Sequence, residues 1–276
     1  MLATDKTEIL RGKALSLRRK VLEMVHCAGS GHCGGSLSCA EILSVLYFDK
    51  LNIDPNDPLW EGRDRFVASK GHCAPVLYAA LAMRGFFPVE ELANLRKMGH
   101  FLQGHPDMKK VPGVDISTGS LGMGLSVGIG FALSARLSGC NYRTYVLLGD
   151  GELQEGQNWE AAMCAAKFGL GKLTAIVDCN GVQLDGQVRD IMPLGSIADK
   201  FRAFGWNTVE ADGHDVKSLS VAIDSAGGCA GLPTVIVAST VKGKGISFME
   251  GRHEWHGKPL GKDDFDEAIA QLEASK

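Results

Sequence analysis

The segment GDGELQEGQNW, Gly149 to Trp159, follows the apolar run TYVLLG, which is typical of a buried strand. The strand pattern stops at Asp150, which stands between two glycines with two more carboxylates close behind. Glycine permits a sharp turn and a close approach of the backbone to a ligand. The segment therefore predicts that this strand ends in a turn that presents Asp150 at the edge of a sheet.

A second strand end follows along the chain. The run KLTAIVDCN predicts a strand that ends at Asn180, and a helix at GQNWEAAMCAAKFG separates it from the first strand. Strand-helix-strand connections are right-handed and parallel, so Asp150 and Asn180 are expected at the same sheet edge. Together with a backbone carbonyl just after Asn180 they form an all-oxygen set that suits Mg²⁺. The alternative interpretation is a mere turn at GDG and a cap at Asn180, and the joint placement of the two residues at the ends of consecutive strands argues against it.

Strands and helices alternate along most of the chain. Further strands are predicted at RFVAS, NTVEAD and PTVIVAST, with helical patterns between them. The alternation predicts an α/β fold, in which a mostly parallel sheet carries helices on both faces. No low-complexity linker or internal repeat divides the chain. Residues 1–276 are therefore expected to form a single domain, with a less regular C-terminal tail from about residue 242.

Composition and charge argue against several classes of binding partner and cellular location. The net charge of −3 and the absence of a Lys/Arg-rich block argue against nucleic acid. The charged N-terminal segment and the lack of a long apolar run argue against a signal peptide or a membrane span, so a cytoplasmic protein is expected. The eight cysteines contain no CxxC pair and are expected to be reduced thiols. Three His-Cys pairs do not match the spacing of common zinc sites.

Eight motifs, in this order, resemble the N-terminal half of the transketolase family, which binds thiamine diphosphate. They are GSGHCGGSLSCAEILSVLYF, RFVASKGHCAPVLYAAL, GHPD, STGSLGMGLSVGIG, GDGELQEGQNWEA, DCNGVQLDG, FGWNTVEADGHD and STVKGKGISFMEGRHEWHGKPL. Transketolases of the common kind are more than twice as long. The resemblance therefore covers nearly the whole chain but only about half of such an enzyme.

The resemblance implies positions for the metal and the cofactor. Asp150, Asn180 and the carbonyl of Val182 match the family's ligands for Mg²⁺, in whose place Ca²⁺ or Mn²⁺ can stand. Gly151 matches the glycine that lies against the diphosphate. The positions that match contacts to the rings of the cofactor are Gly119 and Leu121.

Four histidines match the family's active-site histidines. His32 lies in SGH, His72 in KGH, His105 in GHPD and His256 in WHGKPL. By resemblance, His72 and His256 reach the diphosphate, and His32, His105 and His256 reach sugar hydroxyls. Cleavage of a ketose beside its carbonyl requires a hydroxyl proton to leave and return, and imidazole titrates near neutral pH. Structural roles are expected for the other histidines, which are His26, His100, His214 and His253.

Two carboxylates match family residues at a subunit contact. Glu155 and Glu160 correspond to acids next to the glutamate that protonates the aminopyrimidine, so both are catalytic candidates and Glu155 is also a cofactor contact. Carboxylates brought together in a buried interface share protons, because like charges disfavour full ionisation. Glu152 receives no role and is expected to be solvated.

The family's second half is absent from this sequence, and with it the activating glutamate, the pyrimidine pocket and most residues that grip the sugar phosphate. The resemblance therefore implies a chain that is inactive alone. It implies a separately encoded partner with the pyrimidine-binding domain, assembled as two copies of each chain. The expected reaction moves a two-carbon ketol unit from a ketose, typically a phosphate, to an aldose, with thiamine diphosphate and Mg²⁺.

Three other functions are weighed against this one. The glycines of GMGLSVG resemble a dinucleotide fingerprint, but no clear strand precedes them. Thiamine-dependent 2-oxo acid dehydrogenase subunits share the metal motif, although the histidine motifs suit polyhydroxylated substrates better. A cofactor-binding subunit that only regulates its partner is the third, and the retention of every matched metal and histidine position argues against it.

Four positions near the motifs are left without an assigned role. Cys33 replaces the proline that many relatives have after the first SGH, which puts an oxidisable thiol close to the expected site. Lys70, Lys242 and Lys244 are either close to the phosphates or ordinary surface lysines.

Overall fold

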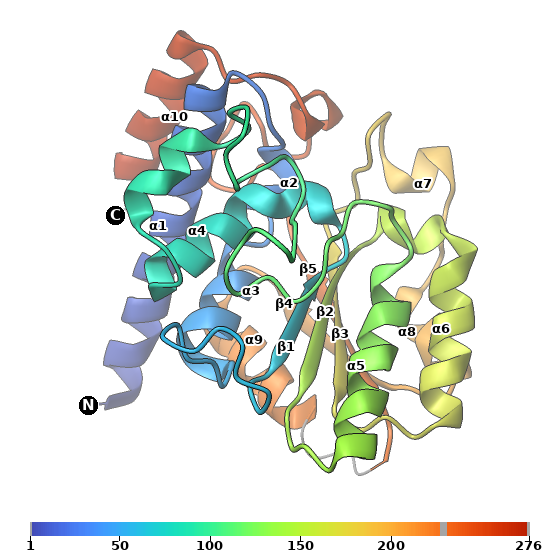
Figure 1. The fold of residues 1–276 in the computed structure, drawn as a ribbon. Helices are drawn as coiled ribbons and strands as arrows, with labels where there is room; N and C mark the ends of the chain where they lie inside the picture. The colour runs from blue at the N-terminus through green and yellow to red at the C-terminus, as the bar shows by residue number, and fades with distance from the viewer. Residues whose placement is uncertain (1, 227–230, 275–276) are drawn as a thin grey trace.

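The computed structural model describes residues 2–226 and 231–274 and contains a five-stranded parallel sheet (Figure 1). The spatial order of the strands is β1-β2-β3-β5-β4, and each neighbouring pair is parallel. The predicted α/β fold is confirmed. The strands are β1 (Arg65–Ala68), β2 (Thr144–Gly149), β3 (Leu173–Cys179), β4 (Asn207–Asp212) and β5 (Thr234–Ser239).

Helices cover both faces of the sheet. In Figure 1, α5, α6 and α8 lie on one side, and α1, α3, α4 and α9 lie on the other. The α-helices are α1 (Leu2–Ala28), α2 (Gly34–Leu37), α3 (Ala40–Val45), α4 (Ala74–Arg84), α5 (Gly124–Ser138), α6 (Gly156–Lys167), α7 (Val188–Ile191), α8 (Ile197–Ala203), α9 (Val216–Ala226) and α10 (Lys262–Ala274). Short helical turns of other types are η1 (Leu46–Lys50), η2 (Gly71–Cys73), η3 (Val89–Asn94), η4 (Gly151–Gln154) and η5 (His253–His256).

The central strands are buried on both faces, which explains their continuous apolar runs. Along β2, Val146 and Leu148 pack into the core under α5, whereas Tyr145 and Leu147 pack into the core on the opposite face. The alternation follows from the period of two residues in a strand. All six residues of β2 are buried, as the sequence predicts for a central parallel strand.

The residues that follow β1, β2, β3 and β5 lie at one edge of the sheet. Gly149 at the end of β2 pairs with Asp178 near the end of β3, and Cys179 pairs with Ser239 at the end of β5. Strand β1 ends at Ala68 on the other side of β2. The prediction that the strands before Asp150 and Asn180 are neighbours is confirmed.

The C-terminal segment is irregular only in part. After β5 the chain runs through turns and η5, and then forms the 13-residue helix α10, which packs against α1. The segment from about residue 242 is therefore irregular, as expected, only as far as residue 261, and a regular helix begins at Lys262. No helix in the described part of the chain is long and apolar enough to cross a membrane.

The described cysteines are all free thiols. Cys33, Cys39 and Cys73 are buried in the core, and burial raises the pKa of Cys33 to about 12. Burial disfavours the thiolate that oxidation requires, which argues against the oxidisable thiol expected at Cys33. Cys229 lies outside the described residues.

Candidate active site

A cavity of about 340 Å³ opens at the carboxyl edge of the sheet. Parallel α/β sheets bind ligands at this edge, because the strand ends and the following loops converge there. The segments that follow β1, β2, β3 and β5 all contribute to its wall. The residues with predicted roles that line it are His72, Leu121, Asp150, Gly151, Glu155, Asn180, Val182 and His256.

The four predicted histidines come from four separate segments and meet beside this cavity. The ring of His32 lies 5.4 Å from that of His72, 5.3 Å from that of His256 and 6.4 Å from that of His105, measured between centroids. The rings of His72 and His256 are 4.9 Å apart. The structure thus brings together residues that are separated by up to 224 positions in sequence (256 − 32).

The environment keeps these imidazoles neutral at pH 7. Burial, reinforced by nearby cations, lowers the pKa of His72 to about 2, that of His256 to about 3 and that of His32 to about 4. The pKa of His105 is also lowered, by burial and then by Arg96. The Nδ1 atom of His32 is buried and has no hydrogen-bond partner in the described residues. Such an atom is costly unless a ligand satisfies it.

Asp150 and Asn180 lie side by side at the ends of β2 and β3. The two carboxylate oxygens of Asp150 accept hydrogen bonds from the backbone nitrogens of Gly151 (2.8 Å) and Gly181 (2.6 Å). The Nδ2 of Asn180 donates to Asp178 at 2.9 Å, which fixes which way the amide is turned. Burial and the charge of Asp178 raise the pKa of Asp150 to about 6. The cost of holding this carboxylate in its charged form is what a cation would relieve.

Lys242 is a buried ammonium beside these oxygens. Its Nζ donates to the carbonyl of Val182 (3.1 Å) and to Nδ1 of His256 (2.8 Å), and its side chain forms no ion pair within the described ranges. Burial, and then repulsion from Lys70, lowers the pKa of Lys242 to about 8. A buried cation without a carboxylate partner favours an anionic ligand. The interpretation of Lys242 as an ordinary surface lysine is wrong.

Comparison with known proteins identifies the architecture around this cavity. The family model described as "Transketolase, thiamine diphosphate binding domain" matches residues 11–274. The chain belongs to the transketolase family. The resemblance inferred from the sequence motifs is thereby confirmed.

Similar proteins include both short subunits and full-length enzymes of this family. A 6-deoxy-6-sulfo-D-fructose transketolase subunit of Clostridium sp. is 44% identical, over 96% of each chain. An apulose-4-phosphate transketolase subunit of Phocaeicola vulgatus is 39% identical, over 97% of this chain and 95% of that protein. The crystal structure of the Campylobacter jejuni transketolase superposes with a TM-score of 0.91 at 34% identity, over 96% of this chain but 43% of that one.

The chain is therefore a transketolase-type transferase subunit of the thiamine diphosphate-binding class. It spans about two fifths of the full-length transketolase that it matches and nearly all of the short subunits. The glycine-rich segment before α5 follows an irregular loop and not a strand, which is not the context of a dinucleotide fingerprint.

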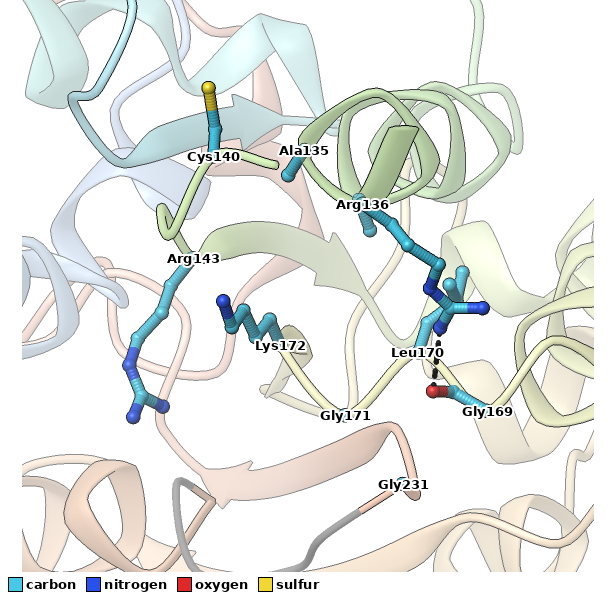
Figure 2. A pocket seen from close by; sticks show the side chains of 10 residues that line it. Ala135, Arg136, Cys140, Arg143, Gly169, Leu170, Gly171, Lys172 and Gly231 are labelled. Atoms are coloured by element: carbon cyan, nitrogen blue, oxygen red, sulfur yellow. Dashed lines mark hydrogen bonds between the residues drawn. The ribbon is translucent and has the colours of Figure 1, made fainter. Parts of the chain in front are cut away.

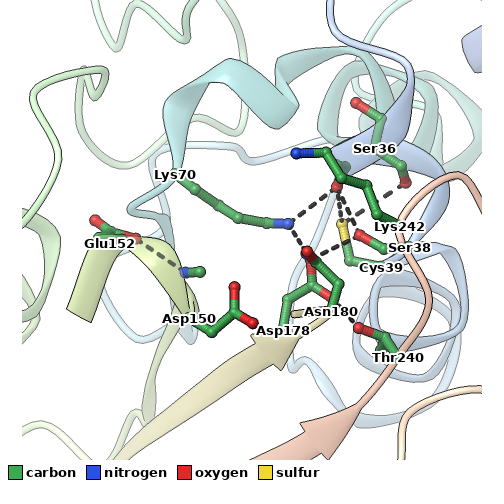
Figure 3. A network of polar contacts seen from close by, with 12 residues as sticks. Ser36, Ser38, Cys39, Lys70, Asp150, Glu152, Asp178, Asn180, Thr240 and Lys242 are labelled. Atoms are coloured by element: carbon green, nitrogen blue, oxygen red, sulfur yellow. Dashed lines mark hydrogen bonds and ion pairs between the residues drawn. The ribbon is translucent and has the colours of Figure 1, made fainter. Parts of the chain in front are cut away.

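Within this transketolase fold, a network of polar contacts surrounds Asp178 (Figure 3), and two of its members, Lys70 and Asn180, line the cavity. Lys70 donates to a carboxylate oxygen of Asp178 and to the carbonyl of Gly35 (2.9 Å). Asp178 also accepts from the hydroxyls of Ser38 (2.6 Å) and Thr240. Burial opposes the charge of Lys70, but the ion pair with Asp178 raises its pKa above the ordinary value. Lys70 is thus buried and paired, and is not a surface lysine.

Glu152 is likewise buried, and the expectation that it is solvated is wrong. Only 3% of the residue is exposed. Its carboxylate accepts from the Ser69 hydroxyl and from the backbone nitrogens of Gly122 and Gly149, the last two at 3.0 Å. Burial raises the pKa of Glu152 despite these bonds. Glu152 therefore joins the end of β1, the glycine-rich loop and the GDG turn, and nothing in the local sequence indicated this.

The remaining predicted positions lie at the rim of the cavity or away from it. Gly119 has a φ of +148°, and an added Cβ would lie 2.9 Å from the His105 ring, so the two residues are in close contact. Leu121 and Glu155 line the cavity and are exposed to solvent. Glu160 is exposed on α6 and does not line the cavity. Lys244 is a surface residue that pairs with Glu250.

The four histidines expected to be structural lie outside the cavity lining. His214 is the clearest case, because its Nδ1 lies 3.1 Å from Glu41 and its Nε2 accepts from the backbone nitrogen of Val241 at 2.8 Å. The other three have partners elsewhere: His26 contacts the Leu260 carbonyl, His100 contacts Glu91, and His253 contacts Glu254.

A second cavity, of about 390 Å³, lies at the opposite edge of the sheet, where the strands begin (Figure 2). Its wall includes the cationic side chains of Arg136, Arg143 and Lys172. None of the residues with predicted catalytic, metal or cofactor roles lines it. The chemistry-bearing residues are thus confined to the carboxyl edge.

Proposed function

We propose that this chain is the metal- and cofactor-binding subunit of a two-chain transketolase, active only with a partner that supplies the pyrimidine-binding domain. The observation that carries the proposal is the convergence of Asp150, Asn180, Lys242 and the histidine cluster on one cavity. The expected assembly has two copies of each chain, in the cytoplasm. Its substrates are a ketose donor and an aldose acceptor, of which at least one carries phosphate or a similar anion.

The residues present fit thiamine diphosphate and Mg²⁺. Asp150, Asn180 and the Val182 carbonyl offer three oxygens of the kind that Mg²⁺ prefers. The ammonium of Lys242 has two carbonyls and one imidazole as partners and would be neutralised by a diphosphate. An added Cβ on Gly151 would lie 3.0 Å from the Cβ of Gln183, so only glycine fits this part of the cavity wall without a shift of Gln183.

Each group of residues has a distinct part in the proposed reaction. When bound, thiamine diphosphate would supply a carbon nucleophile and an electron sink. His32, His105 and His256 bind sugar hydroxyls, and as neutral imidazoles they accept and return a hydroxyl proton. Gly119 and Leu121 would contact the rings of the cofactor, His72 would contact the diphosphate, and Glu155 and Glu160 would contact the partner chain.

The test is a reconstitution of ketol transfer. The tagged chain is purified from its native host with any chain that accompanies it, and transfer from D-fructose 6-phosphate to D-ribose 5-phosphate is assayed with thiamine diphosphate and Mg²⁺. The pair should turn over, and the chain alone should not. Turnover by the chain alone would refute the two-chain proposal, and decarboxylation of pyruvate by the pair without ketol transfer would favour a 2-oxo acid dehydrogenase subunit.

A further inference from the structure

The cavity at the amino edge of the sheet (Figure 2) is large enough for a small molecule. Its volume of about 390 Å³ lies within the range of small-molecule sites and exceeds that of the cavity at the carboxyl edge. The wall is built from the end of α5 and from the segments that precede β2, β3 and β5. The six residues of β2, about 20 Å in length, separate this cavity from Asp150. One small molecule therefore cannot occupy both cavities.

Three cationic side chains line the amino-edge cavity, and none of the described residues in its wall is acidic. Nη2 of Arg136 donates to the carbonyl of Gly169 at 2.9 Å, and Nζ of Lys172 donates to Oδ1 of Asn141. The guanidinium of Arg143 forms no hydrogen bond or ion pair with any residue that the structure describes. Each cation is thus left without a carboxylate partner in the described part of the chain.

The negative charge at this edge is too small to cancel the three cations. The carboxylate of Asp64 is occupied by the backbone nitrogens of Arg143 (2.7 Å) and Asn52 (2.9 Å). Helices α5 and α6 both end at this edge, and the carbonyl end of a helix carries about half a negative charge. A net positive charge therefore remains around the cavity, and such a charge attracts anions.

The backbone fixes the positions from which these cations extend. The carbonyl of Arg143 accepts from the backbone nitrogen of Arg65 at 2.9 Å, and the carbonyl of Lys172 accepts from that of Thr144 at 3.0 Å. Both residues are thus tied to the first rung of the sheet. The guanidinium of Arg136 is held by its bond to the Gly169 carbonyl. A site whose parts are already in place loses less entropy when a ligand binds.

We propose that the amino-edge cavity is a second binding site, which takes a small phosphorylated molecule. The planar guanidinium groups of Arg136 and Arg143 donate in a fork that matches phosphate oxygens, and Lys172 adds a compact positive charge. None of the residues assigned to the metal, the cofactor or the sugar lines this cavity, so its ligand is an effector and not a substrate. The inference does not depend on the proposed ketol-transfer function.

The test is calorimetric titration of the chain with inorganic pyrophosphate and, separately, with D-ribose 5-phosphate. All proteins carry Lys242→Met, which removes the ammonium that would attract these anions to the other cavity. Arg143→Gln/Lys172→Gln in this background should lose at least about 10-fold in affinity, as expected for hydrogen bonds to a charged group. The control Lys167→Gln/Lys217→Gln removes two exposed lysines outside the cavity and should bind like its parent.

The reactivity of a cysteine gives a local measure of where the anion binds. Cys140 lines the amino-edge cavity, whereas Cys27 is exposed and lines a different cavity, between α1 and η3. Alkylation of both thiols by iodoacetamide is followed by mass spectrometry with and without each anion. The anion that binds should slow the alkylation of Cys140 and leave that of Cys27 unchanged.

The outcomes are distinct. Binding of pyrophosphate alone supports a polyphosphate ligand, binding of D-ribose 5-phosphate alone supports a sugar phosphate, and binding of both supports a site for phosphate groups in general. An equal loss of affinity in the control would show that diffuse surface charge binds the anions, which overturns the inference. It is also overturned if neither anion binds, if Arg143→Gln/Lys172→Gln binds like its parent, or if the alkylation of Cys140 is unaffected.

Discussion

Two groups of buried polar side chains lie next to each other at the carboxyl edge of the sheet, and they differ in where their partners are. Around Asp178, the side chains of Lys70, Ser38 and Thr240 all find their partners within the chain. In the adjoining cavity, Nδ1 of His32 has no partner in the described residues, and Lys242 has no carboxylate. Buried polar groups are costly unless they are paired. The first group therefore stabilises the fold, whereas the second is expected to be completed by a ligand.

The largest effect on stability is expected from Asp178→Ala. The substitution leaves Lys70 buried without its counter-charge, and breaking a buried ion pair in this way costs about 3–5 kcal/mol. Urea unfolding measures the change. The matched control is Asp224→Ala, which removes an exposed partner of Lys50 and should cost less than about 1 kcal/mol. If both variants lose the same stability, the Asp178 network does not hold this edge of the sheet.

A smaller loss is expected from Glu152→Gln. The new amide group would place its NH₂ against a backbone nitrogen of Gly122 or Gly149, which leaves a buried donor unpaired and costs about 1–3 kcal/mol. Thermal unfolding of this variant is compared with that of Glu160→Gln, whose side chain is exposed on α6. Equal melting temperatures would contradict the buried position of Glu152.

Acid should destabilise the ligand-free chain through the histidine cluster. In the unfolded chain these imidazoles take up protons near pH 6.5, but His72, His256 and His32 do so in the folded chain only at about 2, 3 and 4. Stability is therefore full above pH 6.5 and falls as the pH drops below it. Carboxyl groups whose pKa values are raised by burial oppose this trend. They are Asp150, with a pKa of about 6, Glu152 and Asp115, and the three imidazoles are expected to outweigh them.

The expected fall between pH 7 and pH 5 is at least about 1 kcal/mol, or roughly 2–4 °C in Tm. Melting curves across this range check it, and His72→Gln should flatten the dependence. A Tm that rises as the pH drops from 7 to 5 would show that the cluster is not neutral in the folded chain.

The smallest effect on stability is expected from Lys242→Met. Removal of a buried cation that has no carboxylate and that repels Lys70 is favourable, but the lost hydrogen bonds to the Val182 and Gln183 carbonyls and to His256 oppose it, so stability should change by less than about 1 kcal/mol. The same variant should bind thiamine diphosphate more weakly. Lys244→Met, at a partly exposed lysine outside the cavity lining, should change neither property. A large loss of stability in Lys242→Met would place Lys242 in the structural group.

The sequence predicts the parts of this site that depend on local pattern. Asp150 and Asn180 follow apolar strands, so their common edge follows from the topology of parallel sheets. The burial of Glu152, Lys70 and Lys242 could not be predicted in this way, because it depends on contacts between distant segments. Lys70 is buried only because Asp178, 108 positions away, neutralises it. A turn at the surface could have the same local sequence, so the local sequence does not reveal whether these residues are buried.

The cavity at the carboxyl edge is expected to bind thiamine diphosphate through a metal held by Asp150. Calorimetric titration of thiamine diphosphate with and without Mg²⁺ tests this, in the wild type, in Asp150→Asn and in the control Asp190→Asn, which changes an exposed carboxylate outside the cavity lining. Titrations are made on the chain alone and on its complex with the partner. Mg²⁺-dependent binding is expected in the wild type and the control, and its loss is expected in Asp150→Asn. Three results would show that this cavity is not the cofactor site. They are binding that does not depend on Mg²⁺, binding that is retained in Asp150→Asn, and no binding even by the complex.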